Sequence, residues 1–142
     1  MKYLLDTNVI SELRKLKSGN CAPHVGRWAR QVSGDQLYLS VITIHELNLG
    51  TLLMERRDPT QGRILRTWLD EQVIPLFSSR IIPVTTQIAF QCSHLHVPNP
   101  RPEMDALIAA TAQVQDLTLV TRNIADFNGI DIKLLNPWLG GT

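Results

Sequence analysis

The stretch KYLLDTN, residues 2–8, begins with a short apolar segment that ends at an acid. Apolar side chains then recur at helical spacing at Val9, Ile10 and Leu13. The pattern therefore predicts a strand over 2–5, followed at once by a helix whose N-cap is Thr7 or Asn8. A buried strand that runs directly into a helix is typical of α/β proteins.

The rest of the chain alternates in the same way. Further strands are predicted over 37–41, 81–84, 117–120 and 130–134, and the proline in 81–84 favours an edge position for that strand. Helices are predicted over 23–32, from 42 through 53, up to 95, over 104–115, and as a short helix capped by Asn123. A long amphipathic helix is predicted from residue 59, with five side chains inward: Ile64, Leu65, Trp68, Leu69 and Val73. Strands separated by helices imply a single α/β domain over 1–142, three layers deep, with a central parallel sheet.

Composition narrows the class of protein. The 142 residues suit one compact domain, and 44% apolar with 19% charged residues excludes disordered and fibrous proteins. No apolar run approaches the roughly 20 residues that a membrane helix needs. Two cysteines give no disulfide framework, so we expect a cytoplasmic protein with no membrane partner. The net charge is only +1, but basic residues gather within 13–34 and acidic ones within 103–131.

Acidic residues follow three of the predicted strands. Asp6, Glu46 and Asp126 come after the first, second and fourth strands, and Asp105 opens the helix before the fourth. The carboxyl ends of parallel strands share one edge of the sheet, so we expect the four carboxylates to converge there. Their mutual repulsion calls for a divalent cation, and all-oxygen ligands favour Mg²⁺ or Mn²⁺. Sites of this kind are typical of phosphodiester hydrolysis.

Four strings in order carry a specific resemblance: LLDTN (4–8), SVITIHEL (40–47), MDALIAATA (104–112) and VTRNIADF (120–127), with NPW at 136–138. Together they resemble the signature segments of PIN-domain ribonucleases, above all the VapC- and FitB-type toxins of type II toxin–antitoxin modules. The resemblance extends over nearly the whole chain.

This resemblance implies a Mg²⁺-dependent endoribonuclease that hydrolyses RNA by in-line attack on phosphorus, leaving 5′-phosphate and 3′-hydroxyl ends. It implies a metal-binding and catalytic quartet of Asp6, Glu46, Asp105 and Asp126, with Asn8, Thr121 and Asn123 holding carboxylates or water around it. It also implies a homodimer, and a small DNA-binding antitoxin whose C-terminal segment wraps the toxin.

Two other functions stay open at this point: a housekeeping PIN nuclease in RNA maturation, and a mainly binding subunit of an operator-bound complex.

The string Cys92-Ser93-His94-Leu95-His96 suggests a zinc site. We interpret it as structural, because alternate residues of a helix point to different faces and no second ligand pair is present. The basic run over 13–34 is interpreted either as a solvated helical face or as a surface that guides RNA or a partner.

Overall fold

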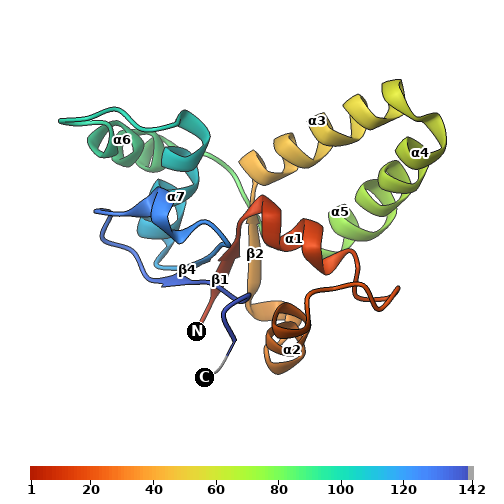
Figure 1. The fold of residues 1–142 in the computed structure, drawn as a ribbon. Coiled ribbons are helices and arrows are strands. Elements are labelled where there is room, and N and C mark those ends of the chain that lie inside the picture. The colour runs from red at the N-terminus through yellow and green to blue at the C-terminus, as the bar shows by residue number, and fades with distance from the viewer. Residues whose placement is uncertain (141–142) are drawn as a thin grey trace.

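The structure is a computed structural model, and it describes residues 1–140 (Figure 1). Within these residues, five strands form one parallel sheet in the order β3-β2-β1-β4-β5. The strands are β1 (Tyr3–Leu5), β2 (Leu37–Ser40), β3 (Ile81–Ile82), β4 (Thr118–Val120) and β5 (Leu134–Leu135). The first strand of the chain is therefore the middle strand of the sheet.

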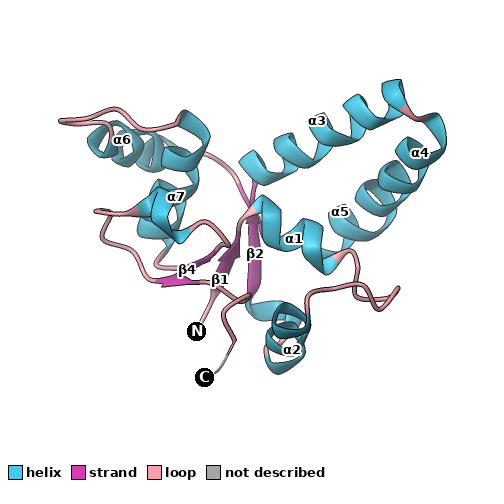
Figure 2. Ribbon diagram, viewed as in Figure 1, coloured by secondary structure: helices cyan, strands magenta, loops and turns pink. Residues whose placement is uncertain are grey.

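Helices connect the strands and cover the sheet on both sides. They are α1 (Thr7–Leu13), α2 (Pro23–Gln31), α3 (Val41–Arg57), α4 (Pro59–Trp68), α5 (Ile74–Leu76), α6 (Thr86–Leu95) and α7 (Glu103–Gln115). Shorter turns are the 3-10 segments η1 (Gly34–Gln36) and η3 (Ile124–Phe127) and the π-helical segment η2 (Leu69–Val73). In Figure 2, α6 and α7 lie on one side of the sheet and α1 with α3 to α5 lie on the other. The predicted α/β architecture with a parallel sheet is confirmed.

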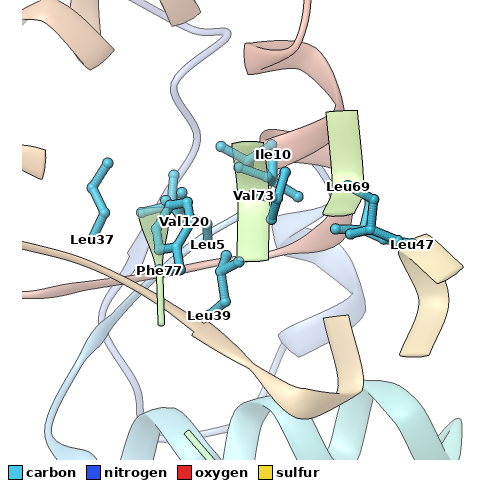
Figure 3. Close-up of a cluster of buried hydrophobic side chains, with 10 residues drawn as sticks. Leu5, Ile10, Leu37, Leu39, Leu47, Leu69, Val73, Phe77 and Val120 are labelled. Atoms are coloured by element: carbon cyan, nitrogen blue, oxygen red, sulfur yellow. The ribbon is translucent and has the colours of Figure 1, made fainter. Parts of the chain in front are cut away.

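Successive strand residues serve opposite faces of the sheet, as the pleat requires. Leu5 and Val120 belong to a core cluster under α1 and η2, which Figure 3 shows. Its buried members are Leu5, Val9, Ile10, Leu37, Leu39, Leu47, Leu69, Val73, Phe77 and Val120. Leu4 and Leu119 face the other way and pack with Ile108, Ala109 and Ala112 of α7. These small alanines let α7 lie close to the strands, so the acid at its first turn has a fixed position.

The start of α1 differs from the prediction. Asp6, not Thr7 or Asn8, is the N-cap residue, and its Oδ1 accepts the Thr7 backbone N–H at 2.8 Å. The sequence pattern located the strand end correctly but assigned the cap one or two residues too late.

The last strand is also shorter than predicted. Only Leu134–Leu135 pair with β4, whereas 130–134 was expected. The Leu119 N–H donates to the carbonyl of Lys133, and the Thr121 N–H donates to that of Leu135. These two hydrogen bonds pair the short strand β4 with residues 133–135. Residues 129–132 instead turn, with Gly129 at φ +82°.

The predicted long helix from residue 59 is correct in extent but not in all its inward residues. Leu69 and Val73 are buried, but Ile64 is 50% exposed. The π-helical segment η2 follows α4, and Trp68 before it packs on the same core cluster as Leu69 and Val73 within it. Ile64 instead lines a surface cleft with Arg63 and Thr67. None of the described helices has the length and apolarity needed to span a membrane.

Candidate active site at the carboxyl edge of the sheet

The four predicted acids lie on elements that follow the strands at their carboxyl ends. Asp6 directly follows β1, and Glu46 lies in the second turn of α3, which begins where β2 ends. Asp126 lies in η3 after β4, and Asp105 is the third residue of α7. The Ser40 hydroxyl fixes the start of α3 because it accepts the Ile42 N–H at 3.0 Å.

Asp6 is the buried centre of this edge, with 8% of its surface exposed. Its Oδ2 accepts hydrogen bonds from Thr121 Oγ1 at 2.8 Å and from Asn8 Nδ2 at 3.5 Å, while Oδ1 takes the Thr7 N–H. Burial raises the pKa of Asp6 above its ordinary value, since these hydrogen bonds lower it by less; the charge of Asp126 adds to the rise. A carboxylate held in this way favours a nearby cation.

Glu46 is oriented by a side chain that sequence reasoning missed. Thr7 Oγ1 donates to Glu46 Oε1 at 2.5 Å and lies 3.5 Å from the buried Thr43 hydroxyl. Thr43 lies three residues before Glu46 on α3, on the same face of the helix. That spacing in the string TIHE, together with the threonine of DTN, was the available signal. Thr7 thus links two carboxylates, because its backbone N–H serves Asp6 and its hydroxyl serves Glu46.

Asp105 and Asp126 are held less firmly. Asp105 is half-buried, and burial first, then the charges of Asp6, Asp126 and Glu46, raises its pKa. Those charges are near enough to act on Asp105 from three different elements. Asp126 is exposed and raises the pKa of both Asp6 and Asp105. Electrostatically, the four acids therefore form one group.

The three predicted supporting residues behave differently from one another. Asn8 and Thr121 both contact Asp6, and Asn8 Oδ1 also accepts the Arg122 N–H at 3.2 Å. Asn123 takes part through its backbone, whose N–H donates to Thr121 Oγ1 at 3.1 Å. Asn123 is the N-cap residue of η3, as predicted, but its exposed side chain forms no cap hydrogen bond. These bonds fasten the loop after β4 to the end of β1.

The donor set fits a hard divalent cation. Every candidate ligand atom in the quartet is a carboxylate oxygen, which suits Mg²⁺ or Mn²⁺. Within residues 1–140, no three of these acids bring an oxygen each within 4.8 Å of one another. That spread leaves room for water, and Mg²⁺ in proteins keeps several waters while taking one or two carboxylates directly.

A separate cluster lies at residues 92–96. His94 is exposed and bonds back to the Phe90 carbonyl, whereas Cys92 of α6 and His96, the C-cap residue of that helix, lie one turn apart. With Glu103 at the start of α7, their ligand atoms all lie within 4.8 Å of one another. The sequence showed no second ligand pair, and the packing of α7 on α6 brings Glu103 to this place as a single third side chain.

Comparisons with known proteins agree with this fold. The family model of the PIN domain matches residues 3–133, which include all four acids. Toxin FitB of Neisseria gonorrhoeae is 33% identical over 140 residues, covering 95% of this chain and 97% of that protein. The VapC ribonuclease Y4jK of Sinorhizobium fredii is 31% identical over 143 residues, covering 95% and 96%. The solved structure of FitAB bound to a DNA fragment matches with a TM-score of 0.85 at 30% identity, covering 96% of this chain and 95% of that one.

Proposed function

The chain belongs to the PIN-domain family of VapC- and FitB-type proteins, and on this premise we propose that it is a metal-dependent endoribonuclease, the toxin of a type II toxin–antitoxin pair. One relative is named a toxin and another a ribonuclease, and both align along nearly the whole chain. The observation that carries the proposal is the buried Asp6, surrounded by the charges of Asp105, Asp126 and Glu46 at one edge of the sheet.

Asp6, Glu46, Asp105 and Asp126 would hold Mg²⁺ or Mn²⁺. A cation at this edge would supply Lewis-acid stabilisation of the charge that develops during phosphodiester hydrolysis. The raised pKa values of Asp6 and Asp105 support this, because burial first and neighbouring negative charges second make the charged carboxylates less favourable, and a cation offsets both effects. The products of water attack would be RNA ends with 5′-phosphate and 3′-hydroxyl groups.

The contribution of the protein's own residues is orientation. Thr121 and Asn8 fix Oδ2 of Asp6, and Thr7 fixes Glu46. Each of these donors removes a rotational freedom that the carboxylate would otherwise lose on binding the cation and RNA. Asp126, exposed and on a short 3-10 turn, is the acid best able to move toward RNA or solvent.

A cognate antitoxin is the partner that the relatives suggest, since FitAB has been solved as a complex on DNA. We propose the same kind of partner here, and we propose that the toxin is a homodimer that acts in the cytoplasm. Each protomer would consist of one PIN domain over residues 1–142, of which 141–142 lie outside the described residues. A cleft at the C-terminal end of α1 suits RNA or an acidic partner segment, because Arg14, Lys17 and Arg63 line it with Trp68. The Arg14 guanidinium lies over the Trp68 ring, 6.0 Å from its centre.

The experiment is RNA cleavage by the purified protein with Mg²⁺ or with EDTA, using Asp6→Asn as the inactive variant. Asp35→Asn is the matched control, because Asp35 is an exposed acid before β2, at the opposite edge of the sheet. We expect cleavage only with the cation, normal rates for Asp35→Asn, and loss of activity in Asp6→Asn.

Cleavage that continues undiminished in excess chelator would exclude the metal mechanism. Cleavage by Asp6→Asn equal to wild type would point to a contaminating nuclease. A protein that cleaves no RNA yet forms an operator-bound complex with its antitoxin would favour the binding-subunit alternative. Processing of one defined precursor RNA without growth arrest would favour the housekeeping nuclease.

A further inference from the structure

The cluster between α6 and α7 combines three different ligand types outside the quartet. Cys92 Sγ lies 3.9 Å from His96 Nε2 and 4.0 Å from Glu103 Oε1, and His96 Nε2 lies 2.9 Å from Glu103 Oε2. Cys92 lies in α6, His96 is the C-cap residue of that helix, and Glu103 is the first residue of α7. The proposed ribonuclease reaction uses none of these three side chains.

We propose that Cys92, His96 and Glu103 bind a transition-metal ion of the Zn²⁺ type, which clips the end of α6 to the start of α7. A thiolate and an imidazole select Zn²⁺ or Co²⁺ over Mg²⁺, so this site and the carboxylate quartet prefer different ions. Tetrahedral ligands at ordinary zinc distances lie about 3.4–3.6 Å apart. Cys92 Sγ and His96 Nε2 are 3.9 Å apart, and one ligand atom from each of the three residues lies within 4.8 Å of the others, so small side-chain shifts bring the ligands into place.

In the metal-free protein, hydrogen bonds hold the three side chains together, and binding of the ion displaces the protons of these bonds. The Arg101 N–H donates to His96 Nδ1 at 3.1 Å, so the ring proton is on Nε2, from which it donates to Glu103. The Cys92 thiol also faces the Glu103 carboxylate. Binding through Nε2 moves the ring proton to Nδ1, turns the Arg101 amide away, and releases the thiol proton to solvent. One proton therefore leaves for each ion bound.

The position of the cluster gives the clip its effect. Residues 97–102 between the two helices contain three prolines and no helix or strand, so side chains rather than backbone pairing join α6 to α7 there. The buried Cys92 anchors the site, and the Glu103 side chain, 65% exposed, leaves an open path for the ion and a water as fourth ligand. Asp105 lies two residues after Glu103, so the clip also restrains a quartet residue.

The test is binding of Co²⁺ and Zn²⁺ to the full chain, read by absorption and equilibrium dialysis rather than by cleavage. A thiolate ligand gives Co²⁺ an intense near-ultraviolet charge-transfer band that the carboxylate quartet cannot produce. We expect this band in wild type and in the Cys21→Ser control, and its loss in Cys92→Ser. Because Cys92 is buried, His96→Gln is the second variant and His94→Gln, at an exposed position on the same helix, is its control.

We expect His96→Gln to weaken Zn²⁺ binding at least tenfold and His94→Gln to leave it unchanged. Absence of the thiolate band in wild type would overturn the proposal, as would equal Zn²⁺ affinities of the two histidine variants. Because neither readout involves RNA, failure of this site and failure of the ribonuclease proposal are distinguishable.

Discussion

Gly62 marks the closest approach of α4 to α3, and replacing it tests the packing that positions the helix of Glu46. A Cβ at residue 62 would lie 2.4 Å from Glu55 Cα and 2.7 Å from Glu55 N. These are backbone atoms, and 2.4 Å is about 1 Å short of an ordinary carbon–carbon contact, so α4 must move away from α3. The buried Gly62 thus allows α3 and α4 to pack closely against each other.

Two opposing effects set the size of the change in Gly62→Ala. Overpacking of this kind costs about 1–3 kcal/mol, and alanine in place of glycine in a helix returns about 1 kcal/mol. We therefore expect a net loss of up to about 2 kcal/mol in the free energy of unfolding. For a chain of this size, that lowers the melting temperature by up to roughly 8 °C.

Gly50→Ala is the matched control, because Gly50 lies in α3 and a Cβ there meets no atom within 4 Å. It keeps the gain in helix propensity without the overlap, so its melting temperature should rise by a few degrees at most. The assay is thermal unfolding followed by circular dichroism, in the same buffer for all three proteins. If Gly62→Ala proves as stable as Gly50→Ala, the inferred contact between α3 and α4 is wrong.

Two further predictions concern the carboxylates. In EDTA, Asp105 of the folded protein keeps its proton at pH values above the ordinary carboxyl pKa of about 4. The free energy of unfolding should therefore fall as the pH rises from about 4 through the raised pKa of Asp105. For Asp105→Asn, we expect a smaller fall in the free energy of unfolding with pH, and a higher metal-free melting temperature at pH 7. If this variant is instead markedly destabilised, Asp105 is a structural hydrogen-bond acceptor. Thr7→Val keeps the shape but removes the hydroxyl that holds Glu46, so we expect RNA cleavage to drop about 10–100-fold at unchanged melting temperature. Thr7→Ser should restore it, and full activity of Thr7→Val would exclude a positioning role.

Sequence patterns predicted what depends on local periodicity and strand order. The parallel sheet, the helix boundaries near Pro23 and Leu95, and the strand-end position of Asp6 follow from apolar spacing and prolines, which act within a few residues. Ile64 fits the same periodicity but is exposed and lines a surface cleft, because the side of α4 that meets the core depends on how the helix packs and not on apolar spacing alone.

The site was predictable in its acids but not in its contacts. The bond from Thr121 to Asp6 joins residues 115 positions apart, and only the pairing of β1 with β4 reveals it. The same limit applies to Glu103, which meets Cys92 and His96 only after α7 packs on α6. Tertiary contacts of this range leave no periodic signal in a single sequence.

The central position of β1 has a consequence for synthesis on the ribosome. The first strand made is paired on one side with β2 but on the other with residues 118–120, so the sheet has high contact order and its middle stays open until late. A nascent chain that has not yet delivered Leu119 cannot bury Leu4. It also lacks the Thr121 hydroxyl that holds Asp6, and the carboxylate of Asp126. Because domains emerge N-terminus first, the proposed nuclease centre is completed only after residue 126 has emerged. Fragments that end before Asp126 therefore lack the complete centre.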